Sequence, residues 1–277
     1  MANQLASETS PIRVPGGCPK VVPLRTVSHM GNPYPRLKRL IGRAIHRYQL
    51  LEEGDRVLLA LSGGEDSLVL LKFLAEWRRK TPFSWFLSAV HIDLGFESPP
   101  EHEEKLKRLQ EYSASLGVPL RLEKTNYGLM ALEAQEKKVS PCFVCSWHRR
   151  KHLFRLAGQE NYNKIAFGHH KDDLIVTFFL NMCYHGELST LLPRQEMFKG
   201  KVYLIRPLVF VDKALISQFS KREGLPVFEN PCPLSEETRR VKMERFLEEK
   251  LYPINPKFKG NIFHAIFNCR PDYLPEL

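Results

Sequence analysis

Apolar and polar residues alternate along the chain in blocks that predict strands and helices in turn. Short apolar runs, such as RVLLAL at 56–61, are followed by segments with helical periodicity, such as SLVLLKFLAEW at 67–77. The predicted strands are 56–61, 86–93, 119–124, 164–168 and 202–208, and the helices between and after them are 67–77, 101–117, 146–158, 172–184 and 212–224. Because strands that alternate with helices form parallel sheets covered on both faces, the pattern predicts an α/β fold with a five-stranded parallel sheet.

The chain on either side of this alternating core has a different pattern. Residues 1–34 are rich in proline, serine, glycine and valine without periodicity, which predicts an extended or poorly ordered arm. A basic helix opens at Pro35 within 35–55 and places its arginines opposite an apolar stripe. These arginines are Arg36, Arg39, Arg43 and Arg47. We therefore expect a main domain over 56–228 and a C-terminal helical extension over 229–277.

Composition and charge narrow the class of protein. A chain of 277 residues can build one full α/β domain plus additional helices. It has no apolar run long enough to span a membrane, and its N-terminus lacks the basic-then-apolar start of a signal peptide. The net charge of +10 favours an anionic partner, most commonly nucleic acid. Six cysteines are too few for a disulfide scaffold of this length, so we expect a reducing, cytoplasmic setting.

The segment SGGEDS at 62–67 lies where the first predicted strand meets the first following helix. Ligands of open parallel sheets bind at this end of the strands. Two glycines allow a tight turn and a close approach to a ligand, and the helix N-terminus favours phosphate. Asp66 suits Mg²⁺, which prefers carboxylate and phosphate oxygens. An ordinary helix N-cap is the alternative interpretation. GHHKDD at 168–173 and HID at 91–93 follow two other predicted strands, so they belong to the same edge of the sheet.

The clustered cysteines allow three interpretations. Cys142 and Cys145 form a C-x-x-C. Structural zinc normally needs four ligands, and His148 or His152 could complete such a set. A redox dithiol is the second interpretation. The third adds Cys232, because three thiolates can hold a [4Fe–4S] cluster and leave one iron open to a substrate such as sulfide.

Taken together, the motifs resemble one family. SGGxDS resembles the PP-loop of the ATP pyrophosphatase superfamily, whose members split ATP between the α and β phosphates and transfer AMP to a substrate oxygen. With further motifs added, the chain is similar to the tRNA 2-thiocytidine synthetase (TtcA) family over residues 36–265. These motifs are C-x-x-C and CSWHRR, GHHxDD, FFLNM, IRPL and a late single cysteine. The resemblance implies a Rossmann-like, adenine nucleotide alpha hydrolase-like fold. It also implies an ATP- and [4Fe–4S]-dependent tRNA sulfurtransferase that adenylates the C2 oxygen of anticodon-loop cytidine 32 and replaces it with sulfur.

The resemblance also implies roles for individual residues in a PP-loop catalytic domain over 56–228. The implied nucleotide contacts are Ser62, Gly63, Gly64, Asp66, Ser67, Asp93, Gly168, His169 and Asp172. The implied catalytic residues are Asp66, as a Mg²⁺ ligand, and the cluster ligands Cys142, Cys145 and Cys232. The implied cofactors are ATP, Mg²⁺ and the [4Fe–4S] cluster. The implied partners are tRNA and a sulfur donor such as a cysteine desulfurase or free sulfide; no membrane is involved, and a homodimer is left open.

Three basic stripes favour RNA over a purely solvated surface. The first stripe follows the C-x-x-C and consists of Arg149, Arg150 and Lys151, the second is the arginine stripe of 35–55, and the third is Arg239, Arg240, Lys242 and Arg245. One such stripe alone is often only solvated, but three together with the net charge point to RNA binding. Trp147 and Phe143 are candidate contacts for a displaced base, although packing in the core is the favoured role of Phe143. Cys183, on an apolar helix, is also expected in the core.

Some features depart from the family's pattern. Glu65 replaces the lysine or valine often found there and puts a negative charge near a triphosphate. Cys232 is single where the family often has C-x-x-C, and residues 1–34 match nothing recognised. The related branch with two zinc fingers is excluded, because Cys18 and Cys269 are unpaired in the sequence. Two alternatives therefore remain: a PP-loop enzyme that thiolates or desulfurises another nucleotide or small molecule, and a non-catalytic, zinc-containing RNA-binding protein.

Overall fold

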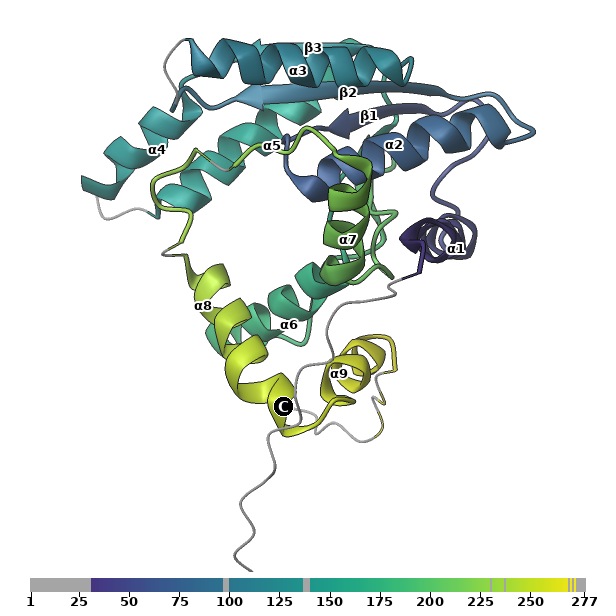
Figure 1. The fold of residues 1–277 in the computed structure, drawn as a ribbon. Helices are drawn as coiled ribbons and strands as arrows, with labels where there is room; N and C mark the ends of the chain where they lie inside the picture. The colour runs from purple at the N-terminus through teal and green to yellow at the C-terminus, as the bar shows by residue number, and fades with distance from the viewer. Residues whose placement is uncertain are drawn as a thin grey trace, which may run out of the picture. The chain divides into compact units, whose positions relative to one another are not determined.

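A six-stranded sheet forms the centre of the fold (Figure 1). Its strands are β1 Arg56–Ala60, β2 Phe86–Asp93, β3 Leu120–Lys124, β4 Lys164–Ala166, β5 Arg194–Met197 and β6 Val202–Ile205. They lie in the order β3-β2-β1-β4-β6-β5, and every neighbouring pair is parallel except β5 and β6. The predicted α/β fold is confirmed. The edge strand β5 is an addition to the five predicted strands.

The computed structural model describes residues 31–96, 100–136, 140–229, 231–236, 238–268, 270 and 272. Residues 1–30 of the predicted arm, together with Cys18 and Cys269, lie outside these ranges. The chain from Pro33 onward forms a unit separate from residues 1–32, and the sheet and all the helices named below belong to this unit.

Helices flank the sheet and extend the chain beyond it. They are α1 Pro33–Arg47, α2 Glu65–Lys80, α3 Glu101–Ser115, α4 Tyr127–Glu136, α5 Pro141–Gln159, α6 Lys171–His185, α7 Lys213–Glu223, α8 Arg239–Phe246 and α9 Phe258–Ile266, with a π-helical turn Leu247–Leu251 and a 3₁₀ turn Tyr252–Ile254. The sequence did not predict α4. Helix α5 begins at Pro141 rather than at residue 146, so the C-x-x-C lies inside its first turns.

The strands bury both of their faces, because successive residues of a strand point to opposite sides. Leu58 and Ile165 pack with Leu153 of α5 on one side of the sheet. Leu59 and Ala166 join the apolar residues of α1, α2, α3 and α7 in the larger core on the other side. Helices α1 and α5 therefore cover opposite faces.

The C-terminal helices pack against α6, as Figure 1 shows for α8 and α9. Arg240 of α8 pairs with Asp173, and Lys259 of α9 pairs with Asp172, at the start of α6. The C-terminal part of the chain is thus fastened to the end of the sheet where ligands are expected. No helix among the described residues combines the length and apolar character needed to cross a bilayer.

Two side chains expected in the core are exposed. Phe143 in the first turn of α5 is 60% exposed, and Cys183 on α6 is exposed as well. Helix α6 buries Leu174, Ile175 and Val176 near its start, but its last turns run past the packed core. The apolar character of this helix therefore does not place Cys183 inside, and the predictions for Cys183 and Phe143 were wrong.

A buried ion pair joins the start of β4 to the residue before β1, at the end of the sheet opposite the expected ligand site. This ion pair gives a stability prediction. The Nζ atom of Lys164 lies 2.6 Å from Oδ2 of Asp55, and the two residues are 1% and 3% exposed. Lys164→Met leaves the Asp55 carboxylate buried without its cation, so we expect a loss of about 3–5 kcal/mol in the free energy of unfolding. Urea titration measures this loss. Adding Asp55→Asn should recover part of it, and an unchanged urea midpoint in Lys164→Met would contradict the prediction.

Candidate active site

The loop between β1 and α2 requires glycine at position 63. Gly63 has φ +86°, and a Cβ atom there would lie 2.6 Å from the ring of Phe228. The Phe228 amide also donates a hydrogen bond to the Gly63 carbonyl at 3.0 Å. The loop is therefore clamped by a segment 165 positions later in the chain, next to the third candidate cysteine.

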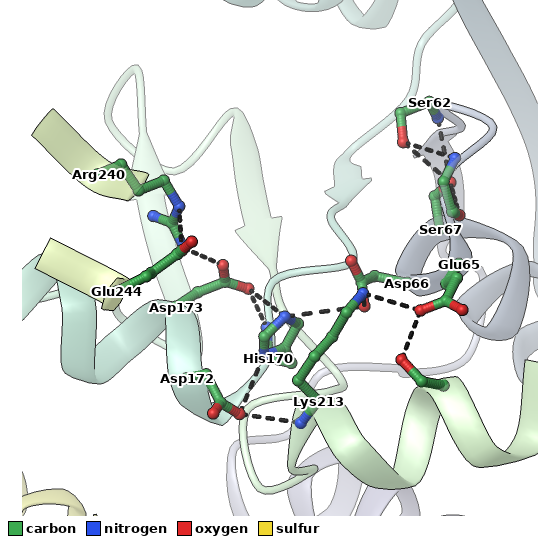
Figure 2. Close-up of polar contacts among 12 residues, drawn as sticks. Ser62, Glu65, Asp66, Ser67, His170, Asp172, Asp173, Lys213, Arg240 and Glu244 are labelled. Carbon is green, nitrogen blue, oxygen red and sulfur yellow. Dashed lines mark hydrogen bonds and ion pairs between the residues drawn. The ribbon is translucent and has the colours of Figure 1, made fainter. Parts of the chain in front are cut away.

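The serine hydroxyls of this loop hold its shape. The Oγ atoms of Ser62 and Ser67 lie 3.1 Å apart, and Ser67 Oγ donates to the Gly64 carbonyl at 2.9 Å (Figure 2). Gly64 occupies the N-cap of α2, and no side chain caps the helix there. An ordinary N-cap is therefore not what this sequence forms. The N–H groups of the first turn of α2 remain suited to an anion.

The loop after β4 packs directly against the first loop. A Cβ atom on Gly168 would lie 3.0 Å from the Asp66 carbonyl carbon and 3.1 Å from the Ser67 nitrogen, so the two backbones approach as closely as glycine allows. His170 Nε2 lies 3.7 Å from Asp66 Oδ1. The structure thus brings together two of the three strand ends singled out in the sequence.

An imidazole surrounded by carboxylates forms the centre of Figure 2. His170 is buried, with Nδ1 3.4 Å from Asp172 Oδ2 and Nε2 3.5 Å from Asp173 Oδ2. Burial alone would lower the pKa of His170, but Asp172, Asp173 and Asp66 outweigh it and raise that pKa above its ordinary value. Burial would raise the pKa of Asp172, but the His170 and Lys259 side chains hold it well below its usual range. The carboxylates therefore favour the protonated form of His170, and His170 and Lys259 favour the ionised form of Asp172.

Lys213 on α7 is a site residue that the sequence analysis missed. Its Nζ lies 2.7 Å from Asp66 Oδ1 and 3.2 Å from Glu65 Oε2 (Figure 2). The Ser217 hydroxyl donates to Glu65 at 2.6 Å. Burial would raise the pKa of Glu65, but Ser217 and Lys213 hold it below its ordinary value. The unusual negative charge of Glu65 is therefore neutralised by α7.

The end of β2 lies beside the first loop through His91, whose Nδ1 is 2.9 Å from the Leu61 carbonyl oxygen. The Asp93 carboxylate instead meets His102 Nε2 at 2.8 Å and the Gly95 amide at 2.9 Å. Within the described chain, these contacts hold Asp93 to its own loop and to α3. Its expected contact with the nucleotide stays a prediction.

The three candidate cysteines lie near one another although Cys232 is remote in sequence. Cys142 is exposed, whereas Cys145 and Cys232 are partly buried. Burial raises the pKa of the Cys142 and Cys145 thiols, and the nearby Cys232 raises both further. Arg149, one turn along α5, acts in the opposite direction on Cys145. Cys232 is thus near enough to Cys142 and Cys145 to affect their thiols, and Arg149 lies beside Cys145.

The histidines proposed for a zinc site have other partners. His152 is buried, with Nε2 2.8 Å from Glu123 and Nδ1 2.9 Å from the Tyr127 hydroxyl. His148 stacks on Tyr127 with ring centroids 5.0 Å apart. Among the described residues, no three His, Cys, Asp or Glu side chains are grouped to hold a single metal ion. These contacts engage both histidines elsewhere and so argue against a Cys₃His zinc site.

The basic stripes lie on different surfaces. Arg149, Arg150 and Lys151 are exposed next to the cysteines on α5. The stripe of α1, which is Arg36, Arg39, Arg43 and Arg47, is exposed as well but belongs to the helix on the opposite face of the sheet. In the third stripe, Arg240 is held by Asp173 and Glu244. The α5 stripe therefore lies beside the candidate cysteines, and Arg240 of the third stripe lies beside the acidic cluster.

His169 gives a pH-dependent prediction. Burial lowers its pKa from 6.5 to about 4, and its Nδ1 accepts a hydrogen bond from Arg206 Nε at 3.2 Å. Between these values the unfolded chain takes up a proton that the folded chain excludes, so the free energy of unfolding falls as the pH falls. His169→Gln keeps a hydrogen-bond acceptor for Arg206. Of the free energy of unfolding that the wild type loses between about pH 7 and pH 5, this variant should retain about 2 kcal/mol. Urea titrations of the wild type and of His169→Gln at the two pH values measure this difference. Identical pH dependence of the free energy of unfolding in the two proteins would contradict the prediction.

The fold and the two joined loops define a PP-loop protein, and a family model of the PP-loop domain matches residues 34–251. The chain is 37% identical to the tRNA-cytidine(32) 2-sulfurtransferase of Alkalilimnicola ehrlichii over 244 residues, which cover 87% of this chain and 75% of that protein. It is 35% identical to the protein of the same name from Pelobacter propionicus, over 87% of this chain and 88% of that one. The chain therefore belongs to the tRNA 2-thiocytidine synthetase (TtcA) family of PP-loop proteins.

A solved structure agrees at the level of the fold. The U34-tRNA thiolase NcsA from Methanococcus maripaludis, determined with its [4Fe–4S] cluster, superposes with a TM-score of 0.70 at 23% identity. The match covers 85% of this chain and 78% of that one.

Proposed function

We propose that the chain is an ATP-dependent tRNA sulfurtransferase that adenylates the C2 oxygen of cytidine 32 and replaces this oxygen with sulfur. The names of the relatives give sulfur transfer to cytidine 32 of tRNA, and the chain shares most of its length with them. A C2 oxygen is a poor leaving group, so its conversion to an adenylate lets AMP leave in its place.

One observation carries the proposal: the thiols and the nucleotide loop are physically joined. The segment that holds Cys232 near Cys142 and Cys145 is the same segment whose Phe228 binds the Gly63 carbonyl. In this proposal, sulfur delivery and phosphate binding take place next to each other. A nucleotide-binding protein without a thiolation role gives no reason for this connection.

The PP-loop residues have separable roles in this proposal. Main-chain N–H groups at 63–67 bind the phosphates and hold the departing pyrophosphate. Asp66 fits Mg²⁺, because this ion is commonly held by one or two carboxylates together with substrate phosphates. Ser62 and Ser67 keep the loop in shape, and the close contact at Gly168 fixes the second loop against it. His169, Asp172 and Asp93 stay as proposed contacts to the nucleotide.

Cys142, Cys145 and Cys232 fit a [4Fe–4S] cluster as an all-sulfur donor set. Three thiolates of this kind would hold the cluster and leave one of its irons open. A cluster held by these three cysteines would supply an iron without a protein ligand, to which an inorganic sulfur atom from free sulfide or a cysteine desulfurase could bind. Arg149 opposes the burial that raises the pKa of the Cys145 thiol, so it favours the thiolate that a cluster would need.

The experiment is a complete reaction under anaerobic conditions. The chain, reconstituted with iron and sulfide, is mixed with MgATP, sulfide and an unmodified tRNA that carries cytidine 32. We expect mass spectrometry of the digested tRNA to show 2-thiocytidine, with AMP and pyrophosphate formed in step. Sulfur in another nucleoside would support the alternative substrate. Zinc in place of iron, with RNA bound but no ATP consumed, would support the non-catalytic alternative.

A further inference from the structure

A second cavity, of about 1060 Å³, lies between α5, α6 and the β5–β6 hairpin. It is separate from the smaller pocket that contains Asp66 and His170. Arg240 lines both, and Ser146 and Trp147, which line the large cavity, directly follow Cys145. The cavity is therefore next to the pocket of Asp66 and His170 and next to the candidate cysteines, although the PP-loop residues are not among those that line it.

Among the described residues, the lining of this cavity is basic and includes no carboxylate. Its cations are Arg149, Arg150, Lys151, Arg206 and Arg240. Its remaining side chains are largely apolar or aromatic, and its polar ones are neutral. A cavity with this composition suits a ligand with a flat apolar body and a negative charge.

Arg206 is the unusual member of the lining, because it is only 4% exposed. Its guanidinium donates to His169 Nδ1 at 3.2 Å, to Gln195 Oε1 at 3.3 Å and to the Leu192 carbonyl. All three acceptors are neutral, and burial lowers the pKa of Arg206 to about 10 despite attraction to Asp173. A guanidinium has five N–H donors, so two have no acceptor in the described part of the chain and can serve a ligand. A buried cation held by neutral groups is costly unless a ligand acceptor joins it.

Aromatic rings supply the walls. Phe154 meets Phe198 edge to face at 4.9 Å, and Phe167 stacks on His169 at 5.4 Å. Trp147 is 46% exposed, and the Lys151 ammonium lies 4.9 Å from its ring centre. Exposed aromatic rings beside basic side chains are what an unstacked RNA base requires, since it stacks on the ring while its phosphates meet the cations.

We propose that this cavity receives the target nucleotide of the RNA after it has turned out of its loop, an inference that rests on the proposed function. The base lies among the aromatic walls with its acceptor edge toward Arg206, and the flanking phosphates lie at Arg149, Arg150 and Lys151. Arg206 then distinguishes the pyrimidines. Cytosine presents a lone pair at N3 to the guanidinium, whereas uracil carries an N–H there and repels it.

The test uses anticodon stem-loop RNAs that differ only in C or U at position 32, without ATP or sulfide. Binding is followed by the fluorescence of Trp147, with Trp147→Phe to identify the signal. We expect the C32 RNA to quench this fluorescence and to bind roughly tenfold more tightly than the U32 RNA. Thr177→Phe, which places a ring inside the cavity, should remove the quench and weaken binding of the C32 RNA about tenfold. Gln110→Phe, at an exposed position of α3, controls for the added ring.

Arg206→Gln tests the discrimination separately, and thermal melting confirms that each variant is folded. We expect it to bind the two RNAs with equal affinity. Unchanged binding and quenching in a folded Thr177→Phe would overturn the proposal, as would unchanged preference for C32 in a folded Arg206→Gln. Thiolation is scored on its own: normal 2-thiocytidine formation by Thr177→Phe would reject the cavity and keep the function. Binding of the C32 RNA that depends on the cavity, without any thiolation, would keep the cavity and reject the proposed function.

Discussion

Asp66→Asn is expected to lower ATP consumption about a thousandfold while the fold and RNA binding persist. A carboxylate that holds Mg²⁺ against the phosphates contributes several kcal/mol to the stabilisation of developing charge, and about 4 kcal/mol corresponds to that factor. The substitution keeps the size of the side chain, and Lys213 keeps its contact with Glu65 at 3.2 Å. The measurement is pyrophosphate release in the presence of tRNA and sulfide.

Glu65→Gln is the matched control for this prediction. Glu65 is the preceding residue, carries the same charge and contacts the same lysine. Because its carboxylate also accepts a hydrogen bond from Ser217 on α7, we place it outside the phosphate site and expect ATP consumption within a few-fold of the wild type. Equal losses in the two variants would mean that the local charge balance matters and that Asp66 has no special role.

Cys232→Ser is expected to remove the iron–sulfur cluster and to lower tRNA thiolation by more than about 100-fold. Changes in the outer shell of a metal site already cost about 10–100-fold, so the loss of a ligand should exceed this. The protein purified without oxygen should lose its broad absorption near about 400 nm together with its iron and sulfide. Cys142→Ser and Cys145→Ser should behave in the same way.

Cys183→Ser provides the control for this series. Cys183 is exposed near the end of α6 and is not among the three cysteines that influence one another. We expect this variant to keep iron, colour and activity. A Cys232→Ser protein that retains its full iron content and thiolates tRNA normally would exclude Cys232 as a ligand.

The parts of the fold that the sequence predicts are those with strong apolar periodicity. The runs around Leu58 and Ile165 predicted parallel strands because both faces are buried. Strand β5 has the sequence RQEM and pairs with β6 at the sheet edge. It has no apolar face of its own, so its residue pattern did not predict a strand. Pro141, in contrast, marks the true start of α5 in the sequence, because proline suits the first helical turn, although the predicted helix began only at residue 146.

The candidate site shows the same limit. Loops that follow strands can be placed from topology, and Gly168 does pack against Asp66 as the shared sheet edge predicts. Lys213, Arg240 and Lys259 come from helices far along the chain, and only tertiary packing brings their charges to the loops. The positions of Lys213 and Lys259 carry no motif, and the basic stripe that contains Arg240 indicated RNA rather than a partner carboxylate. Side chains that balance charge across elements are therefore the part of such a site that the sequence alone does not reveal.

The position of Lys213 has a consequence for the order in which ligands arrive. Its ammonium already lies between Glu65 and Asp66, where it serves as a resident substitute for a divalent ion. Mg²⁺ that arrives alone must displace this charge and gains little from doing so. Mg²⁺ that arrives on ATP brings phosphates to which Lys213 can turn. Metal and nucleotide should therefore enter together, and millimolar Mg²⁺ without ATP should leave the melting temperature unchanged.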